Sequence, residues 1–311
     1  MQWFDDVQIF LVIVFLLVFL NFFLFLFVTI KSGKVKAVED GEKTRSNFTV
    51  STPQNEIFDG RSNGGGVSGK REKRVLFILN DFSDLVLYFG PILFATLRNN
   101  CEVFILNIQP LFNKRYTWLK SCVTVVCETI GLSASNVVFV WDERFPDQRT
   151  NSAGDPWPIF LLMHIIQSYA ILYDVDFITT YDADGINDHS GRQAINDAVG
   201  SLWRKRMLPK RVEIYLLTSA SIIRSIGGMF DAPISWLSSE SSGGSYRRGR
   251  LMSSLSELLV LQRLYVLCEW QRGKFGLWSV VKVGTLLNWN RYFLTNDYHM
   301  IQDEEKYRLH D

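Results

Sequence analysis

The sequence predicts an α/β domain with a Rossmann-like, mostly parallel sheet and helices on both faces, preceded by one transmembrane helix. Two observations predict this class. From residue 74 onward, short runs of β-branched and aromatic residues alternate with amphipathic stretches of helical length. Near the N-terminus, residues 9–30 are apolar apart from Asn21 and Thr29 and carry no ionised side chain. About 20 such residues span a bilayer as a helix.

The flanks of this apolar run predict its orientation. Asp5 and Asp6 precede it, no small-residue cleavage pattern closes it, and lysines follow directly. A cleaved signal peptide would have a basic start and a shorter core, and the positive-inside rule places the lysines in the cytosol. We therefore expect residues 1–8 in the lumen, an uncleaved anchor at 9–30, and everything after it in the cytosol. Asn47 begins a glycosylation sequon that this topology would leave unmodified.

Beyond the anchor, residues 31–73 are polar and glycine-rich, which predicts a flexible cytosolic linker. The folded domain is expected at 74–236. Its strands are expected at residues 75–79, 103–108, 137–140, 177–181 and 212–217. Its helices are expected at residues 85–99, 116–130, 158–173 and 192–207. This alternation requires right-handed crossovers between parallel strands.

Residues 237–311 differ in character and are expected to form a C-terminal loop and helical extension. A Ser/Gly-rich loop is followed by an amphipathic stretch at 255–270 and then by a tail rich in aromatic and cationic residues. Charged residues interrupt its apolar stretches, so a second membrane span is excluded. Two alternatives stay open: a face that lies on the membrane, or packing against the sheet domain.

Charge and cysteine content exclude some classes of function. The formal net charge is +1, and the sequence shows no basic stripe of the kind that binds nucleic acid. The cysteines are Cys101, Cys122, Cys127 and Cys268, and none forms a C-x-x-C pair. We expect four reduced thiols that act as small apolar residues.

Carboxylates directly follow two of the expected buried strands. Asp81 and Asp84 come after the strand at 75–79, and Asp182 and Asp184 come after the strand at 177–181, with His189 soon after. Open α/β sheets bind ligands just beyond the carboxyl ends of their strands. The tips of these two strands are therefore the expected site.

Several motifs in this order resemble the N-acetylglucosaminyl-phosphatidylinositol de-N-acetylases, the PIG-L (LmbE-like) family. They are Tyr88-Phe89-Gly90-Pro91, Phe145-Pro146-Asp147, Tyr181-Asp182-Ala183-Asp184-Gly185 and, between 208 and 235, Leu208-Pro209-Lys210 and Asp231-Ala232-Pro233-Ile234-Ser235. The resemblance runs from about residue 74 to 236. It implies a zinc-dependent amide hydrolase on the cytosolic face of the endoplasmic reticulum membrane. Such an enzyme removes acetate from N-acetylglucosaminyl-phosphatidylinositol in the second step of GPI-anchor synthesis.

The first family motif, Ala-His-Pro-Asp-Asp-Glu, is degenerate in this chain. The matching residues are Asn80-Asp81-Phe82-Ser83-Asp84-Leu85. Asp84 keeps the position of the carboxylate zinc ligand, and Asp81 replaces the histidine ligand but can still bind zinc. Ser83 replaces the general base, and a serine hydroxyl does not take a proton from water near neutral pH without activation.

The second family motif is degenerate too. His189 keeps the position of the histidine that stabilises the oxyanion or donates a proton, and Asp182 keeps the position of the family's aspartate after the strand. Arg192 stands where the third zinc ligand is expected, and a guanidinium cannot ligate a cation. Asp184 stands where a small residue is usual, and Arg144 occupies a pocket-rim position where an acid is common. Arg144 is expected either to bind phosphate or to be solvated.

Three interpretations of these substitutions stay open. In the first, Arg192 replaces the metal and pairs with Asp81 or Asp84. In the second, zinc is retained on Asp81, Asp84 and an acid such as Asp184, with His189 activating water. In the third, the polar loop residues only cap helices, as Ser83 or Asp84 would.

Two functions follow from the resemblance. The chain either removes acetate from the glycolipid with zinc, or it is an inactive homologue, without metal, that binds the glycolipid or a GPI-synthesis partner at the membrane. We expect no nucleic-acid partner, and the sequence identifies no protein partner.

Overall fold

The structure is a computed structural model that describes residues 71–110, 116–145, 156–220, 248–271, 292 and 295–301. The predicted luminal segment, the anchor at 9–30 and the linker up to residue 70 lie outside these residues. Within the described ranges, no helix is both long and apolar enough to cross a membrane.

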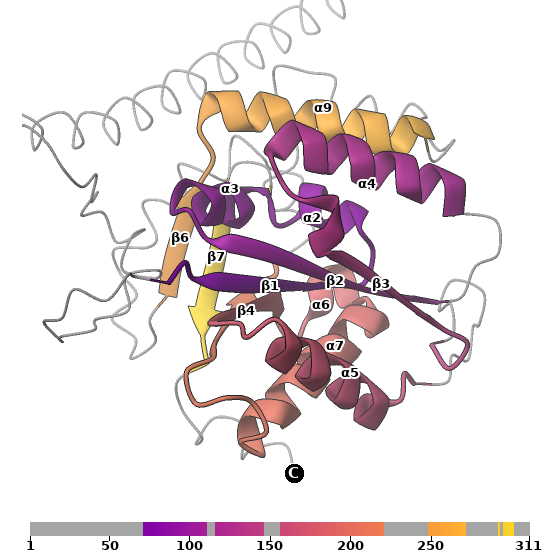
Figure 1. Ribbon diagram of the computed structural model, residues 1–311, viewed down its shortest axis with the longest axis vertical. Coiled ribbons are helices and arrows are strands. Elements are labelled where there is room, and N and C mark those ends of the chain that lie inside the picture. Colours follow the sequence, from indigo (N-terminus) through magenta and orange to yellow (C-terminus); the bar gives the residue numbers. More distant parts are fainter. Residues whose placement is uncertain are drawn as a thin grey trace, which may run out of the picture.

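A seven-stranded sheet in the order β3-β2-β1-β4-β5-β7-β6 organises the chain (Figure 1). The strands are β1 (Arg74–Leu79), β2 (Glu102–Pro110), β3 (Val137–Asp142), β4 (Phe177–Tyr181), β5 (Glu213–Leu217), β6 (Arg248–Met252) and β7 (Thr295–Met300). β1 to β5 pair in parallel, and β7 pairs antiparallel with both β5 and β6. The prediction of a mostly parallel sheet is confirmed.

Helices cover both faces of the sheet. They are α2 (Ser83–Leu87), α3 (Gly90–Arg98), α4 (Tyr116–Ile130), α5 (Ile159–Leu172), α6 (Gly185–Asp188), α7 (Ser190–Arg204) and α9 (Leu255–Gln271). One face carries α2, α3, α4 and α9, and the other carries α5, α6 and α7 (Figure 1).

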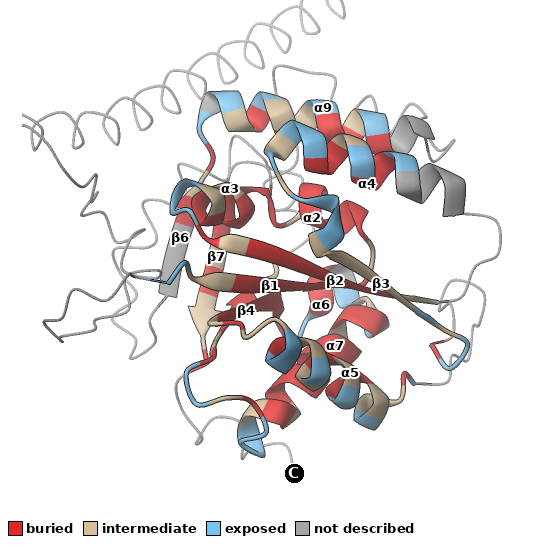
Figure 2. Cartoon of the chain, in the orientation of Figure 1, coloured by how far each residue is buried: buried red, intermediate tan, exposed pale blue. Residues whose placement is uncertain are grey.

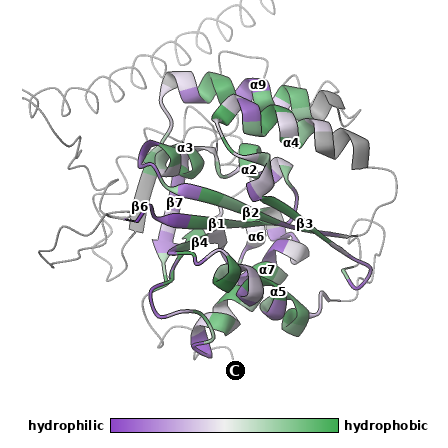
Figure 3. Cartoon of the chain, viewed as in Figure 1, coloured by the Kyte–Doolittle hydropathy of each residue, from purple (hydrophilic) through white to green (hydrophobic). Residues whose placement is uncertain are grey.

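The core lies between these layers. In β1 every residue after Arg74 is buried, and β4 is buried throughout, although β4 includes Thr179 and Thr180. Thr180 satisfies its buried hydroxyl by donating to the carbonyl of Ile78 at 3.1 Å. Figures 2 and 3 show that the central strands are both buried and apolar, as parallel strands covered on two faces require.

The predicted helix at 85–99 is wrong as a single helix. The chain forms α2 and α3 instead, with the break at Tyr88 and Phe89. Pro91 lies in the first turn of α3. Proline has no N–H to donate and its ring clashes with the carbonyl four residues earlier, so a helix cannot run through it without a kink.

The predicted boundary at residue 236 does not separate the C-terminal part from the domain. Leu216 of β5 pairs with His299 of β7, and β6 extends the same sheet. Asn296 of β7 is fully buried; its side-chain amide donates to the carbonyl of Tyr88 at 2.7 Å and its carbonyl accepts the N–H of Ile92 at 3.2 Å. Packing against the sheet domain is therefore the arrangement that β6, α9 and β7 adopt. The aromatic tail at 272–291 lies outside the described residues.

The expectation of four reduced thiols is wrong for two cysteines. Cys122 of α4 and Cys268 of α9 form a disulfide, with their Cα atoms 5.4 Å apart. The pair is separated by 146 residues, so only the packing of α4 against α9 brings it together. Cys101 and Cys127 are buried free thiols.

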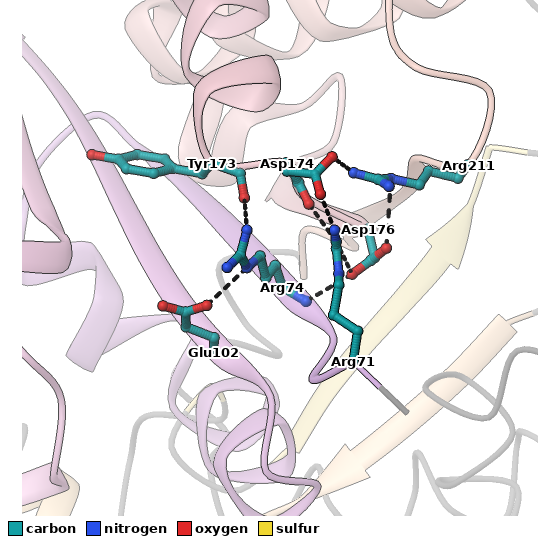
Figure 4. Close-up of polar contacts among 7 residues, drawn as sticks. All are labelled: Arg71, Arg74, Glu102, Tyr173, Asp174, Asp176 and Arg211. Atoms are coloured by element: carbon teal, nitrogen blue, oxygen red, sulfur yellow. Dashed lines mark hydrogen bonds and ion pairs between the residues drawn. The ribbon is translucent and has the colours of Figure 1, made fainter. Parts of the chain in front are cut away.

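The chain enters the sheet through a cluster of ion pairs (Figure 4). Arg71 binds the carboxylates of Asp174 and Asp176, and the backbone N–H of Arg74 donates to Asp176 at 2.9 Å. Arg211 reaches the same two aspartates from the loop before β5. The fold therefore begins by Arg71, within the segment that the sequence assigned to the linker.

Candidate functional site

The candidate site lies where the strand order reverses. The chain leaves β1 toward β2 on one side and leaves β4 toward β5 on the other, so the connections after these adjacent strands diverge to opposite faces. In open α/β sheets, ligands usually bind at this position, beyond the carboxyl ends of β1 and β4, and we refer to it as the crevice. Of the predicted site residues, Asp84 after β1 and Arg192 after β4 meet there.

Arg192 and Asp84 form a buried bidentate ion pair. Nε of Arg192 donates to one carboxylate oxygen of Asp84 at 3.0 Å, and Nη2 donates to the other at 2.9 Å. Asp84 is 2% exposed and Arg192 is 8% exposed. The third guanidinium nitrogen, Nη1, donates to the carbonyl of Ile186 at 2.9 Å. The pairing predicted for Arg192 is present, and Asp84 rather than Asp81 is its partner.

Two tyrosines complete the surroundings of this pair. The Tyr181 hydroxyl donates to Asp84 at 2.6 Å and accepts the backbone N–H of Asn80 at 3.1 Å. The rings of Tyr88 and Tyr181 lie 4.8 and 5.5 Å from the guanidinium carbon of Arg192, within the range of cation–π attraction. Burial, reinforced by Asp84, raises the pKa of Tyr181 well above its ordinary value. Burial opposes the charge on Arg192, but Asp84 and these tyrosines hold its pKa above the ordinary arginine value.

Asp81 and Ser83 are engaged with each other at the start of α2. One carboxylate oxygen of Asp81 accepts both the backbone N–H and the hydroxyl of Ser83, each at 3.0 Å. This is the pattern of an Asx turn. The N-cap of α2 is Phe82, with no side-chain cap bond, so the prediction that Ser83 or Asp84 caps the helix is wrong. The carboxylate of Asp84 is bound by Arg192 instead.

Asp182 braces the loop after β5. Its carboxylate accepts the backbone N–H of Ser219 at 2.6 Å and also the Ser219 hydroxyl. Burial raises the pKa of Asp182 above its ordinary value, and the bonds from Ser219 oppose that rise. Asp184 is exposed at the start of α6. Ile186, in turn, has a positive φ of 50°, a conformation that β-branched residues rarely adopt; Ser219 and Arg192 hold its backbone N–H and carbonyl.

His189 and Arg144 are the remaining predicted residues. His189 is half-buried and precedes α7, where its carbonyl accepts the N–H groups of Arg192 and Gln193. Arg144 is exposed and paired with Asp142 through two side-chain bonds of 2.8 and 2.6 Å. These bonds lower the pKa of Asp142 to about 2.

The sequence analysis did not predict the contacts that Tyr181, Ser219 and Asn80 make at the site. Tyr181 was interpreted only as a strand residue and as part of a family motif, yet its hydroxyl reaches Asp84 of α2. Asn80 lies at the tip of β1 with its side-chain carbonyl buried. A Cβ at Gly191 would lie 2.6 Å from that oxygen and 3.1 Å from the ring of Trp157, so only glycine fits there.

These residues do not fit the zinc ion that the family resemblance implies. Both oxygens of Asp84 are held by a guanidinium, which also stands where the third ligand would be. Within the described ranges, no group of three or more His, Cys, Asp or Glu is placed to hold a metal ion. A structural zinc site needs four ligands and a catalytic one needs three. We therefore derive no chemical step through a metal.

Comparison with known proteins identifies relatives of the chain. No family model matches the sequence. Over 216 residues the chain is 25% identical to an N-acetylglucosaminyl-phosphatidylinositol de-N-acetylase of Bos taurus, which covers 66% of this chain and 80% of that protein. Over 147 residues it is 30% identical to the protein of the same name from Arthroderma benhamiae, covering 41% of this chain and 44% of that one. The chain is a homologue of the N-acetylglucosaminyl-phosphatidylinositol de-N-acetylases. The suspected family is thereby supported.

Solved structures show a more distant likeness. The N,N'-diacetylchitobiose deacetylase from Pyrococcus horikoshii has a TM-score of 0.47 at 10% identity, covering 75% of this chain and 85% of that chain. The zinc-inhibited form of teicoplanin deacetylase has a TM-score of 0.46 at 11% identity, covering 75% of this chain and 100% of that chain. At these values the likeness carries no argument about this de-N-acetylase homologue.

Proposed function

We propose that this de-N-acetylase homologue functions in GPI-anchor biosynthesis and binds N-acetylglucosaminyl-phosphatidylinositol at the crevice beyond β1 and β4. The names of both curated relatives support the glycolipid and the pathway. The ion-paired site lies at the sheet position where α/β proteins take ligands. A single-pass anchor in the endoplasmic reticulum membrane, with the domain in the cytosol, belongs to the same proposal.

The chain binds the glycolipid without hydrolysing it through zinc. The observation that carries this part is the buried pair of Arg192 and Asp84. A metal would have to displace a guanidinium that makes two short bonds to the carboxylate, and the displaced cation would be buried without a partner. Ser83, at the position of the general base, offers no group that takes a proton from water near neutral pH.

Deacetylation is the second candidate function, and a specific observation favours it: both curated relatives carry that activity in their names. A site of this kind would need a base other than Ser83. His189 is half-buried directly before α7, and histidine is a common general base.

The two functions are separated by one assay on purified full-length protein in detergent. Deacetylation of N-acetylglucosaminyl-phosphatidylinositol is followed by mass spectrometry, with added zinc, without it and with a chelator. We expect no turnover under any of these conditions. Chelator-sensitive turnover would overturn the binding proposal and establish the hydrolase.

Binding is measured on the same preparation by displacement of a fluorescent glycolipid analogue. Asp184→Ala removes an exposed carboxylate at the crevice, and Glu128→Ala removes an exposed carboxylate from α4, outside the crevice. We expect the first variant to change the affinity and the second to leave it unchanged. Absence of both turnover and binding in folded protein would reject both functions.

A further inference from the structure

The outer face of α5 exposes large apolar side chains. Phe160 is 79% exposed, Leu172 is 69% exposed and Ile171 is 56% exposed. Helical spacing places them in one stripe with His164 and Ser168, which are exposed as well. Large apolar side chains that gather on one surface, unlike scattered ones, mark an interaction site. Figure 3 shows the apolar character of α5 on the side of the sheet opposite α4 and α9.

A basic segment runs beside this stripe. Residues 204–211 contain five arginines and lysines and no acidic residue. Two contacts tie this segment to α5. The ammonium of Lys205 lies 5.2 Å from the centre of the Phe160 ring, and the Gln167 side chain donates to the carbonyl of Met207 at 2.8 Å. The stripe and the basic segment therefore form one surface, which we call the α5 face.

Two cations of the segment have acidic neighbours. Arg211 is bound by Asp174 and Asp176 in the cluster of Figure 4. Partial burial raises the pKa of Asp197, and the charge of Arg204 opposes part of that rise. The remaining cations, at positions 205, 206 and 210, are exposed. They lie beside exposed apolar side chains, so a matching partner must offer both anionic groups and an apolar region.

We propose that the α5 face docks on the surface of an anionic lipid bilayer. Aromatic and aliphatic side chains enter the boundary between headgroups and acyl chains, while lysine and arginine bind lipid phosphates. The Lys205 ammonium lies over the Phe160 ring, so a cation and an apolar side chain are already next to each other on this face. A free phosphate would engage the cations but would leave Phe160, Ile171 and Leu172 in water, so a bilayer accounts for both halves of the surface.

Docking would also bring the crevice close to lipid. Trp157 lies one turn before Phe160, and its ring packs against the start of α7 at Gly191, next to Asn80 of the site. The inference does not rest on the proposed function, because the α5 face would bind an anionic bilayer whatever the crevice holds.

The test places an environment-sensitive fluorophore on the α5 face of the full-length protein. Phe160→Cys is labelled with NBD and reconstituted into vesicles of phosphatidylcholine alone or with added phosphatidylserine. Leu259→Cys, 48% exposed on α9 across the sheet, is the matched control. Thermal unfolding before labelling confirms that both variants fold like the parent chain, whose own free cysteines are buried.

We expect the label at position 160, but not at 259, to shift to the blue and become protected from iodide when phosphatidylserine is present. At a given phosphatidylserine content, adding Lys205→Glu and Arg206→Glu should lower the ratio of protected to unprotected label at least about tenfold, since each cation near the surface contributes about 1 kcal/mol. High salt should have the same effect. A label at 160 that stays in water, responds equally with the one at 259, or is protected without anionic lipid would overturn the proposal. The last result would indicate that this face is covered by neutral lipid or by a second copy of the chain.

Discussion

Replacing Arg192 with methionine tests the central interaction of the site. The substitution keeps much of the side-chain volume but leaves Asp84, which is 2% exposed, without its cation. Two charges about 4 Å apart attract by about 4 kcal/mol at the effective dielectric of proteins. Removing one partner of a buried ion pair costs about 3–5 kcal/mol. We therefore expect Arg192→Met to lower the melting temperature by roughly 10 °C, given about 2–4 °C per kcal/mol for a domain of this size.

The exposed pair of Arg144 and Asp142 supplies a matched control. It has the same residue types and two side-chain bonds, but the Arg144 side chain is 65% exposed. Exposed pairs contribute about 0–1 kcal/mol, so Arg144→Met should change the melting temperature by a few degrees at most. Equal effects of the two substitutions would refute the claim that burial makes the Arg192 pair critical.

A double-mutant cycle on Arg192→Met adds an independent check. Adding Asp84→Asn removes the orphaned charge and should recover part of the loss, with a coupling energy of about 2–3 kcal/mol. Strict additivity would contradict direct coupling.

Three further predictions concern the rest of the described fold. Asn296→Ala should destabilise the protein by about 2–3 kcal/mol, because it leaves two buried backbone groups without partners; urea unfolding measures this. Reducing the Cys122–Cys268 disulfide should cost about 2–5 kcal/mol. Urea unfolding with and without a reductant measures this loss, and identical midpoints would contradict the pairing. Burial raises the pKa of Cys101 and of Cys127 to about 11, so both should resist iodoacetamide in the folded protein at pH 8 and react after denaturation.

Local patterns predicted the central sheet closely, and the reason is physical. The strand at 177–181 and the helix at 116–130 have the predicted bounds. A strand buried on both faces is a continuous run of residues with high β-propensity, and a helix buried on one face has a helical periodicity. β7 was missed because its buried positions are polar or amphipathic: Asn296 and Tyr298 point inward where an apolar pattern is sought. Its pairing with β5 also joins segments about 80 residues apart, a contact that no local pattern encodes.

At the site, the cost of burying an unpaired charge predicted more of the structure than the sequence motifs did. A carboxylate kept at a former ligand position, with an arginine in place of another ligand, indicates an ion pair because each charge is costly to bury alone. The choice between Asp81 and Asp84 could not be predicted, since it depends on the first turn of α2, where Asp81 binds Ser83. The contribution of Tyr181 depends on which face of β4 it occupies, and only the register of the sheet decides that.

The same charge reasoning predicts how a metal site would have to be rebuilt. In this chain Arg192, rather than a metal ion, balances the charge of the Asp84 carboxylate. The melting temperature should therefore not respond to zinc or a chelator. Arg192→His alone removes the cation without completing a ligand set, and it should destabilise the protein about as much as Arg192→Met. Adding Asp81→His supplies a second imidazole and creates a group of His, Asp and His that zinc can bind. That double variant should gain a melting temperature that rises with zinc concentration, because ligand binding to the folded state stabilises it by mass action. A single variant as stable as the parent chain would show that Asp84 does not depend on Arg192 for its charge balance.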